Sequence, residues 1–158
     1  MQTNIRPYTK ADRQACIAAF KTNIPKYFTT SEVTDFEIFL TKIEATGTCG
    51  ENEKTHYYVI TLNENVIGCG GFGHKDGSNN LALAWGLIHN NYHLKGYGAA
   101  LLLHRLTTIK TKYPTTQLVI DTTQHSYTFF KKFGFETTKV TNNFYEVGMH
   151  RYDMVYKP

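Results

Sequence analysis

The chain has 158 residues, 41% of them hydrophobic, and 17 Lys and Arg against 13 Asp and Glu give it a net charge of +4. This length and composition fit a single globular domain spanning residues 1–158. The basic residues are scattered, and no segment approaches the roughly 20 apolar residues of a membrane span. We therefore expect a soluble cytoplasmic protein that binds neither nucleic acid nor membranes.

Hydrophobic periodicity and turn residues predict the elements along the chain. In order, they are a strand at 5–9, helices at 10–23 and 31–44, strands at 56–62, 66–73 and 81–88, a helix at about 99–113, a strand at 117–121, a helix at 126–133, and strands at 135–140 and 151–156. The second and third of the three consecutive strands are joined by the turn signal Asp76-Gly77. This order predicts an α/β domain with a mixed, mostly antiparallel sheet of about seven strands and about four helices.

Two glycine motifs compete as ligand-binding loops. Gly68, Gly70 and Gly73 match the dinucleotide fingerprint GxGxxG, but that fingerprint needs a helix directly after the glycines, and here a turn and another strand follow. We predict instead a glycine-rich strand with a bulge or a close approach of two backbones.

The second motif has the context that the first one lacks. The apolar strand 81–88 leads through a loop with Gly96 and Gly98 into a helix whose first turn holds no acidic residue, and Lys95 adds a positive charge. The free N–H groups of a helix N-terminus attract anions, and glycines let a backbone approach phosphate oxygens closely. The motif indicates an anion site; the other interpretation is a strand-to-helix connection without a ligand.

Cysteines and histidines give no metal motif. Cys16, Cys49 and Cys69 are odd in number and widely spaced, which argues against disulfides and CxxC zinc sites. His89 and His93 are four residues apart but have no neighbouring Cys or acidic ligands. We predict reduced thiols and no metal.

Two motifs together resemble one family. The run "HLKGYGAALL", residues 93–102, resembles the [RQ]xxGxG[GA] pyrophosphate loop of the GNAT superfamily of acyl-CoA-dependent N-acetyltransferases, and "FFKKFGF", residues 129–135, resembles that family's later [FL]YxKxGF helix. Their order and spacing agree with the family over nearly the whole chain. The resemblance implies a sheet splayed between its fourth and fifth strands, at Trp85 and Gly86. It also implies an enzyme that transfers an acetyl group from acetyl-CoA to a primary amine of a small molecule or peptide, by direct attack.

The resemblance also implies which residues contact CoA. Backbone groups at the end of the fourth strand would pair with pantetheine, and amides of the loop would hold the pyrophosphate. The residues implied are Leu87, Ile88, His93, Leu94, Lys95, Gly96, Tyr97, Gly98, Ala99, Thr123 and Phe130.

Three of these positions depart from the family pattern. His93 replaces the usual Arg or Gln, so we expect CoA binding to weaken as pH rises. Thr123 replaces an Asn that contacts pantetheine. Phe130 replaces the Tyr that is often credited with protonating the departing thiolate. The usual general acid is therefore absent.

The catalytic base and acid are left open. The strand 81–88 has no Asp or Glu, so Asp121, at the end of the next strand, is the first candidate for the base or for ordering a basic water. A turn or capping carboxylate is the other interpretation. Ser126 and Tyr127 lie one turn before Phe130, and either hydroxyl is a candidate acid or a structural group.

Aromatic residues mark the acceptor side. Tyr27, Phe28, Trp85 and Tyr145 are candidate walls of the amine pocket, and are equally compatible with a core or a homodimer surface. Glu32, Asp35 and Glu37 either attract a cationic amine or complement a helix dipole. The lack of an evident base and acid motivates an alternative function, a non-catalytic acyl-CoA-binding or sensing module.

Overall fold

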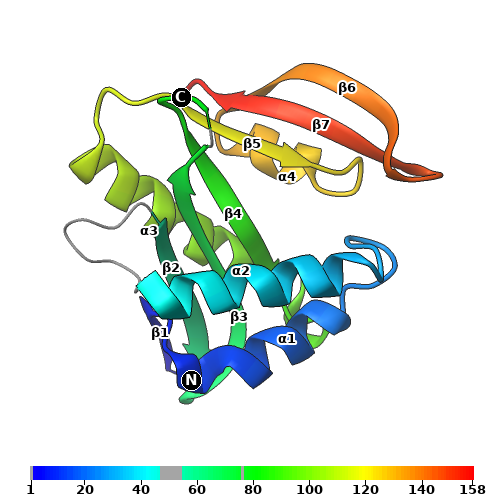
Figure 1. Ribbon diagram of the computed structural model, residues 1–158. Helices are drawn as coiled ribbons and strands as arrows, with labels where there is room; N and C mark the ends of the chain where they lie inside the picture. Colours follow the sequence, from blue (N-terminus) through cyan, green and yellow to red (C-terminus); the bar gives the residue numbers. More distant parts are fainter. Residues whose placement is uncertain (1, 47–54, 76) are drawn as a thin grey trace.

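The computed structural model describes residues 2–46, 55–75 and 77–158; Cys49 and Asp76 lie outside the described residues. The described chain forms one seven-stranded sheet with helices on both faces (Figure 1). Its strand order is β1-β2-β3-β4-β5-β7-β6, and neighbouring strands are antiparallel except β4 and β5, which pair in parallel. The predicted α/β class and mixed sheet are confirmed.

The elements have the following bounds. The strands are β1 Thr3–Pro7, β2 Thr55–Leu62, β3 Asn65–His74, β4 Leu81–Ile88, β5 Leu118–Thr122, β6 Phe135–Glu146 and β7 Met149–Tyr156. The helices are α1 Arg13–Lys21, α2 Glu32–Thr46, α3 Tyr97–Lys112 and α4 Tyr127–Lys132, with short 3-10 turns at Lys10–Asp12 and Asn90–Tyr92.

The sheet is buried between two layers of helices. In Figure 1, α1 and α2 cross one face of the sheet and α3 lies behind the other. Successive residues of β2 alternate between two cores: Tyr57 and Val59 pack on the α1–α2 side, and Tyr58 and Ile60 pack on the α3 side. Such a strand lacks the polar face of a half-exposed strand because both of its faces are covered. Cys16 and Cys69 are free and buried in the α1–α2 core.

The glycines of β3 bring backbones close together, as predicted. A side-chain carbon at Gly68 would lie 2.6 Å from Cδ1 of Ile88 and 2.6 Å from the carbonyl oxygen of Leu87. The motif therefore serves strand packing inside the sheet and does not start a helix.

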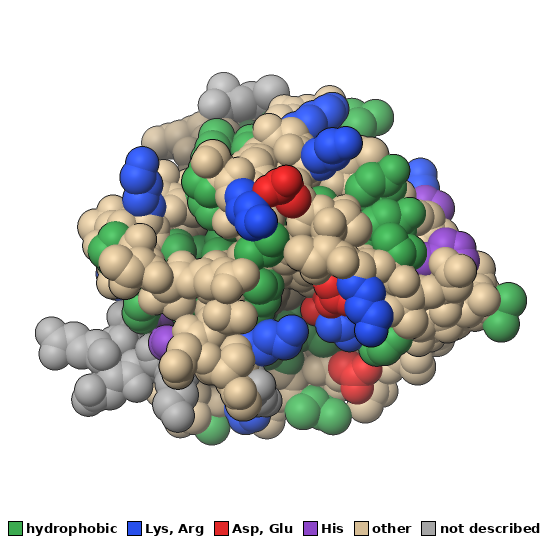
Figure 2. Space-filling model, turned by 90° about the horizontal axis from the view of Figure 1, so that it is seen from above, with side chains coloured by type: hydrophobic (Ala, Val, Ile, Leu, Met, Phe, Trp, Pro, Cys, Tyr) green, Lys and Arg blue, Asp and Glu red, His purple; other side chains and the backbone are tan. Residues whose placement is uncertain are grey.

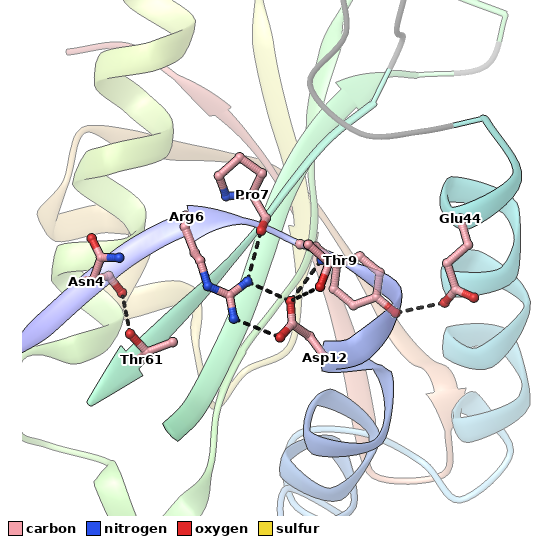
Figure 3. A network of polar contacts seen from close by, with 8 residues as sticks. Asn4, Arg6, Pro7, Thr9, Asp12, Glu44 and Thr61 are labelled. Atoms are coloured by element: carbon pink, nitrogen blue, oxygen red, sulfur yellow. Dashed lines mark hydrogen bonds and ion pairs between the residues drawn. The ribbon is translucent and has the colours of Figure 1, made fainter. Parts of the chain in front are cut away.

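A partly buried ion pair fixes the junction between β1 and α1 (Figure 3). The guanidinium of Arg6 donates two hydrogen bonds to the carboxylate of Asp12, at 2.8 and 2.9 Å. The same carboxylate accepts from the backbone N–H of Thr9 at 2.8 Å. The hydroxyl of Tyr8 donates to Glu44 in α2 at 2.8 Å, so the junction is also tied to the second helix.

Several element ends differ from the sequence prediction. β1 runs from Thr3 to Pro7 rather than over 5–9, because Thr9 is already the N-cap of the following turn. α3 begins at Tyr97, two residues early, because Gly96 with φ +87° is its N-cap. β6 continues to Glu146, six residues beyond the prediction, through residues that are mostly exposed and polar.

Candidate active site

The sheet opens between β4 and β5. These strands pair only at Leu81 with Leu118 and at Ala82 with Val119, near the start of each strand. From Val119 onward β5 is paired with β7 on its other side, while β4 continues to Ile88. One edge of the second half of β4 is therefore not covered by β5, and the predicted splay is confirmed.

A β-bulge in β4 marks the start of the opening. Cys69 pairs with Leu87 and Gly71 with Ala84, so Trp85 and Gly86 together stand opposite the single residue Gly70. Trp85 has φ +40°, a conformation that side chains rarely adopt. An extra residue in one strand bends that strand and redirects its backbone groups.

The ring of Trp85 lies on the α1–α2 face. It contacts four aromatic rings there, with centroid distances of 5.5 to 6.4 Å, from Phe20, Phe28, Phe36 and Phe39. The Trp85 side chain is only partly buried and Phe28 is partly exposed. Both side chains are therefore packed in this aromatic cluster and remain partly accessible.

β4 leads into the N-terminus of α3. The first turn of α3 contains no acid and its last turn contains Lys110 and Lys112. Main-chain N–H groups in the first turn of a helix have no partner within that helix, and the helix dipole favours anions there. A side-chain carbon at Gly98 would lie 3.8 Å from Ile88 and 3.8 Å from Phe129, so this glycine faces the end of β4 and α4. The start of α3 and the splay therefore lie next to one another.

His93 does not point freely into this loop. Its Nε2 lies 2.7 Å from the carbonyl oxygen of Ile88 and donates to it. The buried amide of Asn23 donates to the same carbonyl at 3.0 Å, and to Ala19 of α1 at 3.0 Å. The Ile88 carbonyl is therefore already engaged twice, and the Nε2 of His93 is turned toward β4.

Residues expected on the α4 side have defined structural contacts. Thr123 is buried, and its hydroxyl accepts from the N–H of His125 at 3.2 Å. Ser126 is the N-cap of α4. Tyr127 stacks on Tyr152 of β7 with ring centroids 4.2 Å apart. Phe130, at the position where the family pattern has a tyrosine, packs edge-on against Phe129 and Phe135, with ring centroids 5.2 and 5.6 Å apart.

Asp121 and Tyr145, predicted on separate grounds, lie together. The Tyr145 hydroxyl donates to Oδ2 of Asp121 at 2.7 Å, and Arg151 lies 3.9 Å from Oδ1. Burial, followed by the charge of Asp121, raises the pKa of Tyr145, so its hydroxyl remains a donor. The Asp121 side chain is 47% exposed. It is accessible, but a hydrogen bond from Tyr145 occupies one of its oxygens.

Glu32 adds a second carboxylate to this side. It accepts from the backbone N–H of Thr29 at 2.9 Å, just before α2. Burial raises its pKa, the charges of Asp35 and Asp121 act in the same direction, and the Thr29 hydrogen bonds oppose them. The charge of Glu32 also contributes to the raised pKa of Tyr145. Glu32, Asp121 and Tyr145 therefore share one electrostatic environment.

Tyr27 lies at the mouth of the splay. Its ring is edge-on to His93, after β4, at 5.5 Å, and to His125, after β5, at 6.1 Å. A pocket of about 250 Å³ beside it includes Asn23 and Lys26 in its lining. The loop between α1 and α2 thus meets both loops that follow the diverging strands.

Charged groups are spread over the surface in view. Figure 2 shows Lys and Arg side chains dispersed among neutral ones on the face seen from above, some beside acidic side chains. Among the described residues, no three His, Cys, Asp or Glu side chains are arranged to hold a metal ion. None of the described helices is both long and apolar enough to cross a membrane.

We compared the sequence and the fold with those of known proteins. The family model described as an acetyltransferase (GNAT) domain matches residues 25–158. No curated protein matches the sequence.

Solved structures share the fold at low sequence identity. The PaiA N-acetyltransferase from Thermoplasma acidophilum, in complex with coenzyme A, is similar at 16% identity and TM-score 0.74, with 100% of each chain covered. An N-acetyltransferase from Staphylococcus aureus gives 16% identity and TM-score 0.77, with 99% of each chain covered. The ribosomal-protein-S18-alanine N-acetyltransferase from Escherichia coli gives 15% identity and TM-score 0.72, covering 99% of this chain and 94% of that one.

Proposed function

Because the chain belongs to the GNAT acetyltransferase family, we propose that it transfers an acetyl group from acetyl-CoA to a primary amine. One observation carries this proposal: the uncovered edge of β4 leads, through the segment 89–96, to the acid-free N-terminus of α3. The first feature suits an extended pantetheine arm, and the second suits a diphosphate.

The donor is proposed to lie along β4 and α3. The amides from Leu94 to Ala99 hold the diphosphate, with Lys95 adding charge, and the backbone of Leu87 and Ile88 aligns the thioester. The carbonyl of Ile88 already accepts hydrogen bonds from Asn23 and His93. The backbone N–H of Ile88 is therefore the group left to bind the acyl donor. Thr123 and Phe130 form the α4 wall of the same channel.

The reaction is proposed to be a direct attack. The amine nitrogen bonds to the thioester carbon, the carbon–sulfur bond breaks, and the thiolate leaves with the electron pair. A CoA thiol resembles cysteine, whose pKa is roughly 8.5, so its thiolate leaves without strong acid help. This is compatible with Phe130 at the position of the family's tyrosine; Ser126 or Tyr127 remains a candidate donor of a proton.

The base has the harder task. An alkylamine with a pKa of about 10.4 is protonated at neutral pH and must lose that proton before attack. We assign this role to Asp121, acting directly or through a water, with Tyr145 holding its carboxylate in place. Tyr27, Phe28, Trp85 and Tyr145 form the acceptor walls. The similar enzyme named for an alanine of a ribosomal protein makes a peptide amine as reasonable an acceptor as a small molecule.

The test is a calorimetric titration of acetyl-CoA into wild type, Gly98→Asp and Gly98→Ala. Asp places a negative charge at the proposed diphosphate site. Ala is the matched control, because its methyl group meets only ordinary contacts at 3.8 Å. Wild type should bind, and Asp should bind at least about tenfold more weakly than Ala, because Ala adds a side-chain carbon without the charge.

An amine panel then separates two functions. Release of CoA with some amine, reduced at least about tenfold by Asp121→Asn, supports the enzyme. Binding without turnover across the panel would instead support the acyl-CoA-binding or sensing module. No binding by wild type would contradict both.

A further inference from the structure

One charged side chain is buried in the apolar face of α3. Arg105 is 4% exposed, on the face that also carries the buried residues Leu101, Leu102, Leu106 and Ile109. Burial lowers its pKa to about 10, which still leaves the guanidinium charged at neutral pH. A buried charge is normally paired with an opposite one, because it has lost its water.

Arg105 lacks such a partner within the described part of the chain. No described carboxylate forms an ion pair with it, and its Nε has no hydrogen-bond acceptor there. Its one hydrogen bond in that part of the chain runs from Nη1 to the carbonyl oxygen of Gly71, at 3.3 Å. An unpaired buried charge lowers the stability of the fold, so we expect Arg105 to have a role other than stabilisation.

The guanidinium occupies space that two glycines leave empty. A side-chain carbon at Gly86 would lie 3.0 Å from Nη2 and 3.1 Å from Nη1 of Arg105. One at Gly70 would lie 3.3 Å from Cζ of the same group. Gly86 belongs to the β4 bulge and Gly70 is the residue opposite it, so Arg105 packs directly against the bulge.

The bulge is also held from its other face. The hydroxyl of Tyr57, in the α1–α2 core, donates to the carbonyl of Trp85 at 2.7 Å. Arg105 lies on the α3 face and bonds Gly71, the β3 residue next to Gly70. The two groups thus contact Trp85 and Gly86 from opposite faces of the sheet, immediately before Leu87 and Ile88.

We propose that Arg105 is a positioning residue that holds the β4 bulge in the shape that presents Leu87 and Ile88 to the acyl donor. This inference rests on the proposed function, because the shape of the bulge matters for binding only if the acyl donor lies along Leu87 and Ile88. A neutral side chain would fill part of the volume but would not donate to Gly71, so the bulge would lose its fixed geometry.

The chain contains a built-in reporter for this claim. Trp85 is its only tryptophan and lies in the bulge, so tryptophan emission reports the bulge without an acceptor amine. The variants are Arg105→Met, which removes the charge at similar length, and Arg105→Lys, which keeps it. For each, the measurements are Tm, the emission of the free protein and the Kd for acetyl-CoA.

Arg105→Met should keep or raise Tm, because it removes an unpaired buried charge. Its Trp85 emission should nevertheless shift, and its Kd should rise at least about tenfold. Arg105→Lys should restore most of the affinity, to within about threefold of wild type. Unchanged emission and unchanged Kd in Arg105→Met would overturn the proposal and leave Arg105 as a space-filling residue.

Gly86→Ala approaches the same contact from the strand. Its methyl group would press on the guanidinium, so emission and Kd should change in the same direction as in Arg105→Met. In the Arg105→Met background, the added effect of Gly86→Ala should be smaller; strictly additive effects would contradict a shared mechanism.

If Arg105→Met fails to fold, the emission and the Kd of Arg105→Lys and Gly86→Ala test the proposal in its place. If wild type does not bind acetyl-CoA, the proposed function fails, and emission alone still decides whether Arg105 shapes the bulge.

Discussion

Asp12 concentrates several contacts in one carboxylate. Its side chain is 6% exposed and accepts from Arg6, at 37% exposure, and from the backbone of Thr9. We expect Asp12→Ala to lower the free energy of unfolding by about 3 kcal/mol, because Arg6 and the Thr9 N–H lose their acceptor. Urea unfolding measures the change. Glu136→Ala is the control: its pair with Lys157 is exposed and 3.9 Å long, so it should cost less than about 0.5 kcal/mol.

The same residue predicts an acid-sensitive contribution to stability. Burial alone would raise the pKa of Asp12, but the hydrogen bonds from Arg6 and Thr9 outweigh it and place the pKa below the ordinary 3.8. A lowered pKa means that the stabilisation is present above pH 3.8 and is lost as pH falls through the folded-state value. Tm measured from pH 5 downward should therefore fall less steeply in Asp12→Ala than in wild type. Parallel curves would contradict this.

His104 offers an independent probe of the charge on Arg105. Burial lowers the pKa of His104 below 6.5, and the neighbouring charge of Arg105 lowers it further. In an NMR titration, Arg105→Met should raise the His104 pKa and Arg105→Lys should keep it low. An identical midpoint in all three proteins would mean that Arg105 exerts no field on its neighbour.

The loop before α3 is strained at one residue. Leu94 has φ +60° and a fully exposed side chain. Asn tolerates this left-handed conformation better than Leu, so Leu94→Asn should raise Tm by about 2 °C. Affinity for acetyl-CoA should change less than about twofold, because backbone amides hold the diphosphate in our proposal. Leu94→Ala, which keeps the strain, is the control, and an equal gain in Tm there would contradict the explanation.

Elements with a clear apolar signal could be predicted well. The strand 81–88 matches β4, because it is apolar throughout and bounded by polar turns. β6 was predicted too short, since its later residues are mostly exposed and polar and carry no alternation; Thr141 and Glu146 pair with Arg151 and Met149 of β7, with an irregular register between them. The start of α3 was missed by two residues, because the left-handed turn at Gly96 acts as its cap.

Features of the candidate site that depend on local sequence can be read from it directly. The glycine loop and the acid-free helix start lie in one short segment, whereas the opening of the sheet at Trp85 and Gly86 is implied by the family resemblance. Arg105 and Asn23 could not be found this way. Arg105 lies among leucines on a helix face. Its burial is explained by Gly70 of β3 and Gly86 of β4, which have no side chains and leave space for its guanidinium. Asn23 acts on Ile88, 65 residues away.

At the scale of the molecule, the sheet consists of two parts with a short connection. β1 to β4 form one part with α1, α2 and α3, and β5 to β7 form the other with α4 (Figure 1). Between β4 and β5 only two residue pairs join them. Side chains of both parts also share the α3-side core, which includes Leu118, Phe135 and Met154, and the α4 aromatics Phe129 and Phe130 pack against it. A donor in the splay would contact both parts at once.

Hydrogen exchange should reveal that coupling. Bound acetyl-CoA should slow exchange in the second half of β4 and the first turn of α3, which it contacts. It should also slow exchange in β5 and α4, because separating the two parts of the sheet would then require losing the ligand. Gly98→Asp at the same acetyl-CoA concentration is the control and should show neither effect. Protection confined to β4 and α3 would mean that the two parts of the sheet separate independently of the acyl donor. The donor would then bind at the edge of β4 without linking the two parts.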